Sequence, residues 1–116
     1  MEKIKCSQAQ INLSNKISDY LCENINTHIT ISQLADKFNA SPTHIKKIFR
    51  NVYGLPIYAY IRSQKMLRAA QLLRDTNLKI IDIAGEVGYD NGSKFSKAFS
   101  DVMGTTPSIF RKNQHI

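Results

Sequence analysis

Hydrophobic residues repeat at helical spacing in two segments of the chain whose patterns lie 50 positions apart. Within each segment they fall at i, i+3, i+4 and i+7, which is typical of the buried face of an α-helix. A glycine follows each pattern. The first copy comprises Ile45, Ile48, Phe49, Val52 and Gly54, and the second comprises Phe95, Ala98, Phe99, Val102 and Gly104. The pattern therefore predicts a helix over about 42–52 and its duplicate over about 92–102.

A shorter apolar helix pattern precedes each copy. Leu34 marks it in the first half of the chain and Ile83 marks it in the second, and an alanine follows each of them. Asn39 and Gly88 separate the two helices of each pair, and both residue types tolerate the backbone angles of a tight turn. Two helices joined by such a turn form a helix-turn-helix. The chain is therefore expected to carry two helix-turn-helix motifs.

Residues suited to capping stand where these helices are predicted to begin. Thr30 and Gln33 form a capping box before the first motif. Ser41 and Asn91 can each accept a hydrogen bond from the first turn of a duplicated helix. Lys79 occupies the position of Thr30 in the second motif. The first helix of that motif is therefore expected to begin without a side-chain cap.

Two weaker predictions concern the ends of the chain. A helix is predicted over 8–26, because its apolar residues recur every four positions and form one stripe. The stripe comprises Leu13, Ile17, Leu21 and Ile25. One closing helical turn is predicted over 107–111. Residues 1–7 are expected to fray, and the tail from Lys112 is expected to be loose.

The longest predicted helix runs from about residue 56 to Arg74. Its apolar residues cover nearly every side of a helical wheel, whereas a surface helix has one apolar stripe. A connecting helix that two lobes each cover in part explains this pattern. We therefore predict an all-α fold of about seven helices within 8–112, with lobes over about 8–54 and 79–112 around a connecting helix over about 56–74. Because a lobe of about 50 residues buries little apolar surface, the lobes are expected to lean on one another.

Composition adds a charge preference. Sixteen Lys and Arg residues against nine Asp and Glu give a formal net charge of +7, which favours a polyanionic partner without proving one. Cys6 and Cys22 are too few for a disulfide scaffold, and reduced thiols are expected. The apolar runs are far shorter than a membrane span, and no signal peptide opens the chain. A soluble, cytoplasmic protein is expected.

Both duplicated helices keep a polar, cationic face once their apolar positions are set aside. Neither face carries an acidic residue in its first two turns, and Asp101 comes later. Such a helix fits the major groove of DNA, where its N-terminal half meets the base edges. The face of the first helix comprises Thr43, His44, Lys46, Lys47 and Arg50, and that of the second comprises Ser93, Lys94, Ser96 and Lys97.

Other polar residues are better suited to phosphates, which fix position without reading sequence. Contacts to phosphate, or of undetermined kind, are expected at Ser41, His44, Arg50, Arg62, Asn91, Lys94, Arg111 and Lys112. Simpler interpretations stay open at several positions. His44 and Lys94 can be solvated side chains, and Ser93 and Ser96 can be small residues that permit close approach.

The sequence gives little support for a catalytic site. His28, His44 and His115 are not near one another or near a cysteine at metal-ligand spacing. No glycine-rich phosphate loop or nucleophile motif occurs. Asp82 and Glu86 lie four residues apart on one predicted helix, where such a pair is ordinarily solvated. We expect no enzyme activity, metal or cofactor.

The chain resembles the DNA-binding domain of the AraC/XylS family of bacterial transcription regulators over about 17–112. The most specific part of the match is Ile83-Ala84, Val87-Gly88-Tyr89, Ser93, Phe95-Ser96-Lys97, Phe99, Gly104-Thr105-Thr106-Pro107 and Phe110-Arg111. Further support comes from Ser41-Pro42, Ile45, Lys47, Phe49 and Ala69-Ala70-Gln71-Leu72-Leu73.

The resemblance implies seven helices, with two recognition helices entering successive major-groove segments on one face of a duplex. A connecting helix of eighteen residues spans about 27 Å, and adjacent groove openings lie about 34 Å apart. The base-reading residues implied by the resemblance are Thr43, Lys46, Lys47, Gly92, Ser93, Ser96 and Lys97.

Three positions depart from the family pattern. The family often has arginine where Lys47 and Lys97 stand, and lysine where Ser100 stands. Lysine lacks the planar fork of arginine, and Gly92 has no side chain. The second lobe is therefore expected to contribute position and shape more than base identity.

Double-stranded DNA is the expected partner, with RNA polymerase as a further candidate and no membrane. Family members usually carry a separate sensing or dimerising domain that is absent from this chain, so a freestanding regulator and a piece of a longer one both stay open. Two other functions also stay open. One is a protein-interaction adapter with the same fold. The other is the DNA-binding accessory module of an alkylation-repair enzyme, which needs four zinc-bound thiolates where this chain has two cysteines.

Overall fold

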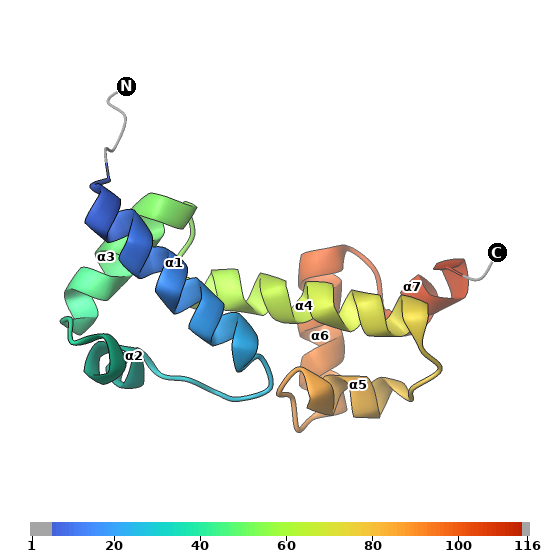
Figure 1. Ribbon diagram of the computed structural model, residues 1–116. Coiled ribbons are helices and arrows are strands. Elements are labelled where there is room, and N and C mark those ends of the chain that lie inside the picture. Colours follow the sequence, from blue (N-terminus) through green and yellow to red (C-terminus); the bar gives the residue numbers. More distant parts are fainter. Residues whose placement is uncertain (1–5, 115–116) are drawn as a thin grey trace. The chain divides into compact units, whose positions relative to one another are not determined.

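The computed structural model describes residues 6–114, which form seven α-helices and no strand (Figure 1). The helices are α1 (Gln8–Glu23), α2 (Ile31–Phe38), α3 (Pro42–Tyr53), α4 (Ile57–Asp75), α5 (Ile80–Glu86), α6 (Gly92–Met103) and α7 (Pro107–Gln114). The predicted all-α fold is confirmed, and the duplicated pattern corresponds to α3 and α6. We call these two the recognition helices.

The chain divides into two compact units. Unit 1 comprises 6–24 and 29–61, and unit 2 comprises 25–28 and 62–114, so that the division falls inside α4. Each unit contains one helix-turn-helix, formed by α2 and α3 in unit 1 and by α5 and α6 in unit 2.

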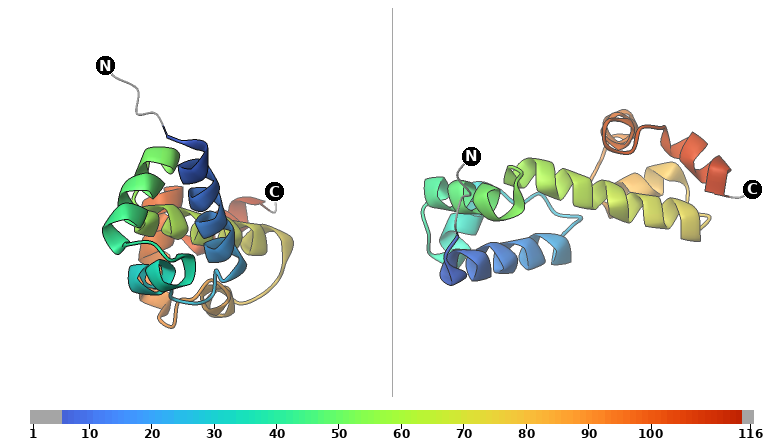
Figure 2. Two further views of the ribbon diagram at one scale, coloured as in Figure 1. Left: turned by 60° about the vertical axis from the view of Figure 1, so that its left-hand side comes forward. Right: turned by 90° about the horizontal axis from the view of Figure 1, so that it is seen from above.

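The core of unit 1 forms where α1, α2 and α3 pack together (Figure 2). Its buried members are Ile17, Leu21, Leu34, Ala35, Ile45, Phe49 and Ile57. Phe49 is fully buried, and its ring lies 4.6 Å from that of Tyr53 and 5.2 Å from that of Tyr60, centroid to centroid. The apolar stripe predicted for α3 therefore holds this unit together.

The core of unit 2 repeats this arrangement around α6. Its buried members are Met66, Ala69, Ala70, Leu73, Ile83, Ala84, Val87, Phe95, Ala98 and Phe99. α4 supplies Ile57 to the core of unit 1 but Met66 and Leu73 to that of unit 2. One helix thus serves two cores, which explains why its apolar residues surround it.

Caps and turns form at the predicted residues. The Thr30 hydroxyl accepts a hydrogen bond from the Gln33 backbone N–H (3.1 Å), and the Gln33 side chain accepts one from the Thr30 N–H (2.8 Å). Asn39 and Gly88 take positive φ angles of 51° and 87°. Lys79 gives α5 no side-chain cap, as expected.

The two ends of the chain differ from the prediction. α1 ends at Glu23, three residues early, and begins with a capping box between Ser7 and Gln10 that the sequence interpretation overlooked. α7 continues to Gln114, so it has two turns rather than one, and Lys112 is helical rather than loose. Within the range expected to fray, Ser7 is instead an N-cap, and residues 1–5 lie outside the described part of the chain.

Candidate nucleic-acid interface

α3 is fixed at its start and presents one exposed polar face. The Ser41 hydroxyl accepts a hydrogen bond from the His44 backbone N–H (3.1 Å), and Pro42 occupies the first helical position. Ile45, Ile48 and Phe49 are buried on the inner side. The residues left exposed are Ser41, Thr43, His44, Lys46, Lys47 and Arg50, all of which the sequence singled out.

α6 is built in the same way. The Asn91 side chain accepts a hydrogen bond from the Lys94 backbone N–H (3.0 Å). Phe95, Ala98 and Phe99 are buried beneath it. The outward residues divide into exposed Asn91, Ser93, Lys94 and Lys97 and half-buried Gly92 and Ser96.

Charge distinguishes the two recognition helices. Lys46, Lys47 and Arg50 on α3 form no ion pair within residues 6–114. On α6, Asp101 lies 3.7 Å from the ammonium of Lys97 and accepts a hydrogen bond of 2.8 Å from the guanidinium of Arg62 on α4. Arg62 and Lys97 in unit 2 are therefore partly neutralised, whereas the cations of α3 are not.

Asp101 was not singled out as a functional residue from the sequence. Its i, i+4 spacing from Lys97 was a usable signal. The contact with Arg62 was not, because the two residues are 39 positions apart and belong to different helices. Asp101 therefore contacts two of the cations for which the sequence predicted DNA contacts.

Replacing Asp101 with asparagine is expected to tighten DNA binding about two- to fivefold, because Arg62 and Lys97 are released and one repelling charge is removed. Fluorescence anisotropy with a labelled duplex at fixed salt measures the change. Asp19→Asn makes the same charge change on an exposed position of α1 and serves as the control. Weaker binding by Asp101→Asn would instead show that the carboxylate positions Lys97 productively.

Arg111, for which the sequence predicted a contact to phosphate or of undetermined kind, forms hydrogen bonds within the protein. Its guanidinium donates to three backbone carbonyls, those of Leu73 (3.0 Å), Thr76 (3.2 Å) and Leu78 (2.6 Å). These carbonyls lie at the end of α4 and in the connection to α5, where helix termini leave acceptors without partners. Arg111 thus fastens α7 to this connection, and its phosphate contact stays a prediction.

Arg111→Ala is expected to lower the free energy of unfolding by about 2 kcal/mol or more, because three charge-assisted bonds to backbone are lost together. Thermal unfolding followed by circular dichroism measures the loss. Arg111→Lys retains the charge but not the fork, so it should be destabilised as well. A stable variant with a shallower salt dependence of DNA binding would favour the phosphate contact.

Residues 6–114 contain no arrangement suited to metal binding or to a membrane span. No group of three or more His, Cys, Asp or Glu side chains there is arranged to hold a metal ion. Burial raises the pKa of the Cys22 thiol, which disfavours the reactive thiolate. No helix in this range is long and apolar enough to cross a membrane. His115, one of the histidines considered from the sequence, lies outside the described residues.

Comparison with known proteins identifies the relatives of this chain. A family model described as a helix-turn-helix domain matches residues 34–113. The HTH-type transcriptional activator AarP of Providencia stuartii is 30% identical over 107 residues, which are 92% of this chain and 79% of AarP. The bifunctional transcriptional activator/DNA repair enzyme AdaA of Bacillus subtilis is 33% identical over 96 residues, which are 83% of this chain and 46% of AdaA.

The share of each relative that is matched varies. The chain spans about a third of the Msm operon regulatory protein of Streptococcus mutans, with 34% identity over 84% of this chain and 35% of that protein. The matched share of these relatives thus ranges from 79% for AarP to 35% for the Msm operon regulatory protein, and the matched region is the part that they share with this chain.

Solved structures share the fold. The C-terminal domain of AraT, a response regulator from Geobacillus stearothermophilus, superposes with a TM-score of 0.84 at 28% identity, over 87% of this chain and 84% of that domain. The DNA-binding domain of AdpA, solved in complex with a target DNA, gives a TM-score of 0.81 at 19% identity, over 86% of this chain and 90% of that domain. At this lower identity the likeness to AdpA concerns the fold alone.

Proposed function

The chain belongs to the AraC/XylS family of helix-turn-helix transcription regulators and binds DNA to regulate transcription, and from this premise we propose how its residues contact the duplex. The N-terminal halves of α3 and α6 enter successive major-groove segments on one face of the DNA. The observation that supports this most strongly is the exposed, acid-free cationic face of α3.

The two recognition helices are proposed to contribute differently to DNA recognition. On α3, Lys46 and Lys47 donate to guanine acceptors, and the Thr43 methyl group can contact a thymine methyl. On α6, the base-reading residues are Gly92, Ser93, Ser96 and Lys97. Asp101 already forms an ion pair with Lys97 in the free protein, and Gly92 has no side chain. α6 is therefore proposed to fix position and sense groove shape more than base identity.

Phosphate contacts are proposed around these helices. The proposed phosphate contacts are Ser41, Arg50, Arg62, Asn91 and Lys112. His44 and Lys94 are proposed as either phosphate contacts or solvated residues. Arg62 has to exchange Asp101 for a phosphate when DNA binds, because its guanidinium is engaged in the free protein. α4 has nineteen residues, which corresponds to about 28 Å, and successive major-groove segments lie about 34 Å apart.

The remaining assignments follow from this function. The proposed DNA-binding domain covers 8–112, with lobes over about 8–54 and 79–112. The protein is proposed to have no catalytic activity of its own, to act in the cytoplasm and to work with RNA polymerase. The second candidate is a DNA-binding module of a repair enzyme, and the name of the relative AdaA is the observation that favours it. The resemblance implies that such an enzyme needs four zinc-bound thiolates, and this chain has two cysteines.

Selection of bound sequences from a random duplex pool tests the proposal. We expect an enriched site with two recognisable segments about one helical turn apart. Binding to the selected duplex should weaken by about 0.9 log units per log unit of salt for each phosphate neutralised. Recovery of unenriched sequences, or no binding to any duplex at low salt, would favour the protein-interaction adapter.

Lys97→Ala tests the division of recognition. We expect it to weaken binding about equally on the selected site and on a panel altered in the segment bound by α6, because the contact supplies position rather than base identity. Competition titrations across the panel give the ratios. Relaxed preference confined to that segment would assign base reading to Lys97 and overturn the proposed division.

A further inference from the structure

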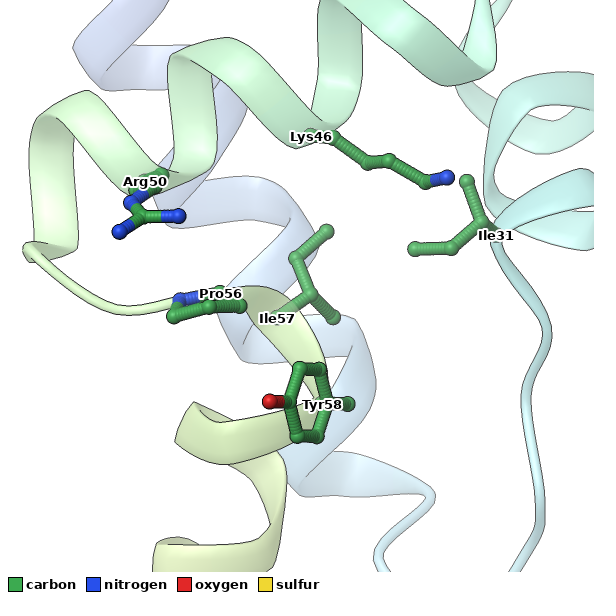
Figure 3. A pocket seen from close by; sticks show the side chains of 6 residues that line it. All are labelled: Ile31, Lys46, Arg50, Pro56, Ile57 and Tyr58. Atoms are coloured by element: carbon green, nitrogen blue, oxygen red, sulfur yellow. The ribbon is translucent and has the colours of Figure 1, made fainter.

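A cavity of about 320 Å³ opens beside α3 in unit 1, and neither the cores nor the other proposed DNA contacts account for it (Figure 3). Its lining residues come from the start of α2, the middle of α3, and the start of α4 with the residue before it. They are Ile31, Lys46, Arg50, Pro56, Ile57 and Tyr58. A volume of this size lies at the lower end of the range for small-molecule sites, so it suits a ligand with a single ring or a short chain.

The floor and one wall of the cavity are apolar. Ile31, Pro56 and Ile57 line what we call the floor, and Ile57 is buried. Tyr58 forms the wall, and its side chain is unusually exposed for an aromatic residue, at 73%. An apolar occupant would cover both the floor and the Tyr58 ring, which is a favourable burial of apolar surface.

The opposite wall carries two cations. Lys46 and Arg50 lie four residues apart on α3, so their side chains stand on one face, and Figure 3 shows both on the α3 side of the cavity. Neither forms an ion pair within residues 6–114, and none of the six lining residues is acidic. The cavity therefore favours an anionic group at this wall, where the guanidinium can bind a carboxylate through two parallel hydrogen bonds.

We propose that this cavity binds a small carboxylate with an apolar body, with the carboxylate at the guanidinium of Arg50 and the body against Ile57 and Tyr58. The charge of the wall and the polarity of the floor select this class together. A phosphate of similar size would turn some of its oxygens toward Ile57 and Pro56, where they would lose their hydrogen bonds. A neutral apolar molecule would leave the two cations without a partner.

The site couples to DNA binding, and this consequence rests on the proposed function. Arg50 is a proposed phosphate contact, and Lys46, a proposed base contact, lines the same cavity, so a carboxylate bound there opposes DNA binding. Because such coupling is reciprocal, DNA should weaken the ligand by the same factor as the ligand weakens DNA. The proposal thus assigns an effector site to the recognition helix itself.

Binding is tested first without DNA, so that its outcome does not depend on the proposed function. The probe is 4-phenylbutyrate, titrated into the whole 15N-labelled chain and followed by amide chemical shifts. We expect saturable shifts confined to the surroundings of Lys46, Arg50 and Tyr58, with a Kd of about 1–5 mM for so small a ligand. The matched control, 4-phenylbutan-1-ol, carries the same ring without the charge and should bind at least about tenfold more weakly.

Two variants test whether Arg50 and Tyr58 contact the probe. Arg50→Gln should weaken 4-phenylbutyrate about tenfold and bring it close to the alcohol. Tyr58→Ala should weaken both probes and leave DNA binding of the ligand-free protein unchanged, because Tyr58 is not a proposed DNA contact. Shifts spread over other parts of the chain, equal binding of acid and alcohol, or no saturation by about 20 mM would overturn the site. Stronger shifts at the same amides with a short acidic peptide than with the probe would overturn it in favour of a protein-docking surface.

Coupling is tested second, with the selected duplex at constant ionic strength. Saturating 4-phenylbutyrate should raise the Kd for DNA at least about fivefold, whereas sodium acetate at the same concentration should not. If the probe binds in the first experiment and DNA affinity stays constant, the proposed antagonism fails although the cavity is a ligand site. If no duplex binds at all, the proposed function fails and the DNA-free titration still decides the site.

Discussion

Alanine at both Lys46 and Lys47 is expected to lower the affinity for the selected duplex about 100-fold, the largest loss that any two surface residues of this chain should produce. A base contact contributes about 1–3 kcal/mol, and two contacts near the lower part of this range add to nearly 3 kcal/mol. The lysines are exposed and form no ion pair within residues 6–114, so their removal breaks no ion pair of the folded protein. The loss should therefore fall on binding and leave the melting temperature unchanged.

The measurement is a competition titration on the selected duplex and on duplexes altered in the segment bound by α3. Lys16→Ala with Lys79→Ala removes the same charge from exposed positions outside the recognition helices and serves as the control. The control should weaken binding only a few-fold through general electrostatics. If the Lys46/Lys47 variant lost equal affinity on every duplex, both lysines would be phosphate contacts and α3 would read no bases through them.

The elements that were predicted well depend on local sequence. The period of apolar residues determines which side of a helix is buried. Three of the four expected residues are buried in each copy, as Phe49 and Phe95 show, while Val52 and Val102 are half-buried. Caps and turns are also local, since Ser41 bonds within its own first turn and Asn39 takes its φ angle largely from its own chemistry. A duplicated motif of this kind can be found without any knowledge of tertiary structure.

The residues that were assigned incompletely depend on contacts between distant parts of the chain. Arg111 bonds to carbonyls more than thirty positions away, and no local pattern distinguishes it from a surface arginine. The pairing of Arg62 with Asp101 is hidden for the same reason. The sequence therefore predicted the polar faces of the recognition helices. It did not predict which cationic side chains form ion pairs or hydrogen bonds within the free protein.

These ion pairs make the charges of the two helix-turn-helix motifs differ, although the motifs share one apolar pattern. The cations of α3 are unpaired within the described residues, whereas Lys97 and Arg62 share Asp101. A phosphate must displace that carboxylate before unit 2 gains the full attraction of its cations. We expect unit 1 to dominate affinity at moderate salt, in line with the larger effect predicted for Lys46 and Lys47.

Phe49→Ala is expected to be the most destabilising of the substitutions considered, with a loss of about 3–5 kcal/mol. Phe49 is fully buried, and its ring packs against those of Tyr53 and Tyr60. A domain of this size has little more stability than that to lose, so the melting temperature should fall by about 15 °C or more. Differential scanning calorimetry measures the fall, and amide hydrogen exchange shows where it occurs.

The exchange pattern also decides whether the two units fold independently. If they do, protection in Phe49→Ala should be lost at Ile17, Leu34 and Ile45 but kept at Phe95 and Phe99, because these groups belong to separate cores. If the lobes depend on one another, as the small size of each suggests, protection should fall in both. Tyr58→Ala removes an aromatic ring of similar size from an exposed position and should change stability by no more than about 0.5 kcal/mol. Equal stability losses in the two variants would show that Phe49 does not anchor the core of unit 1.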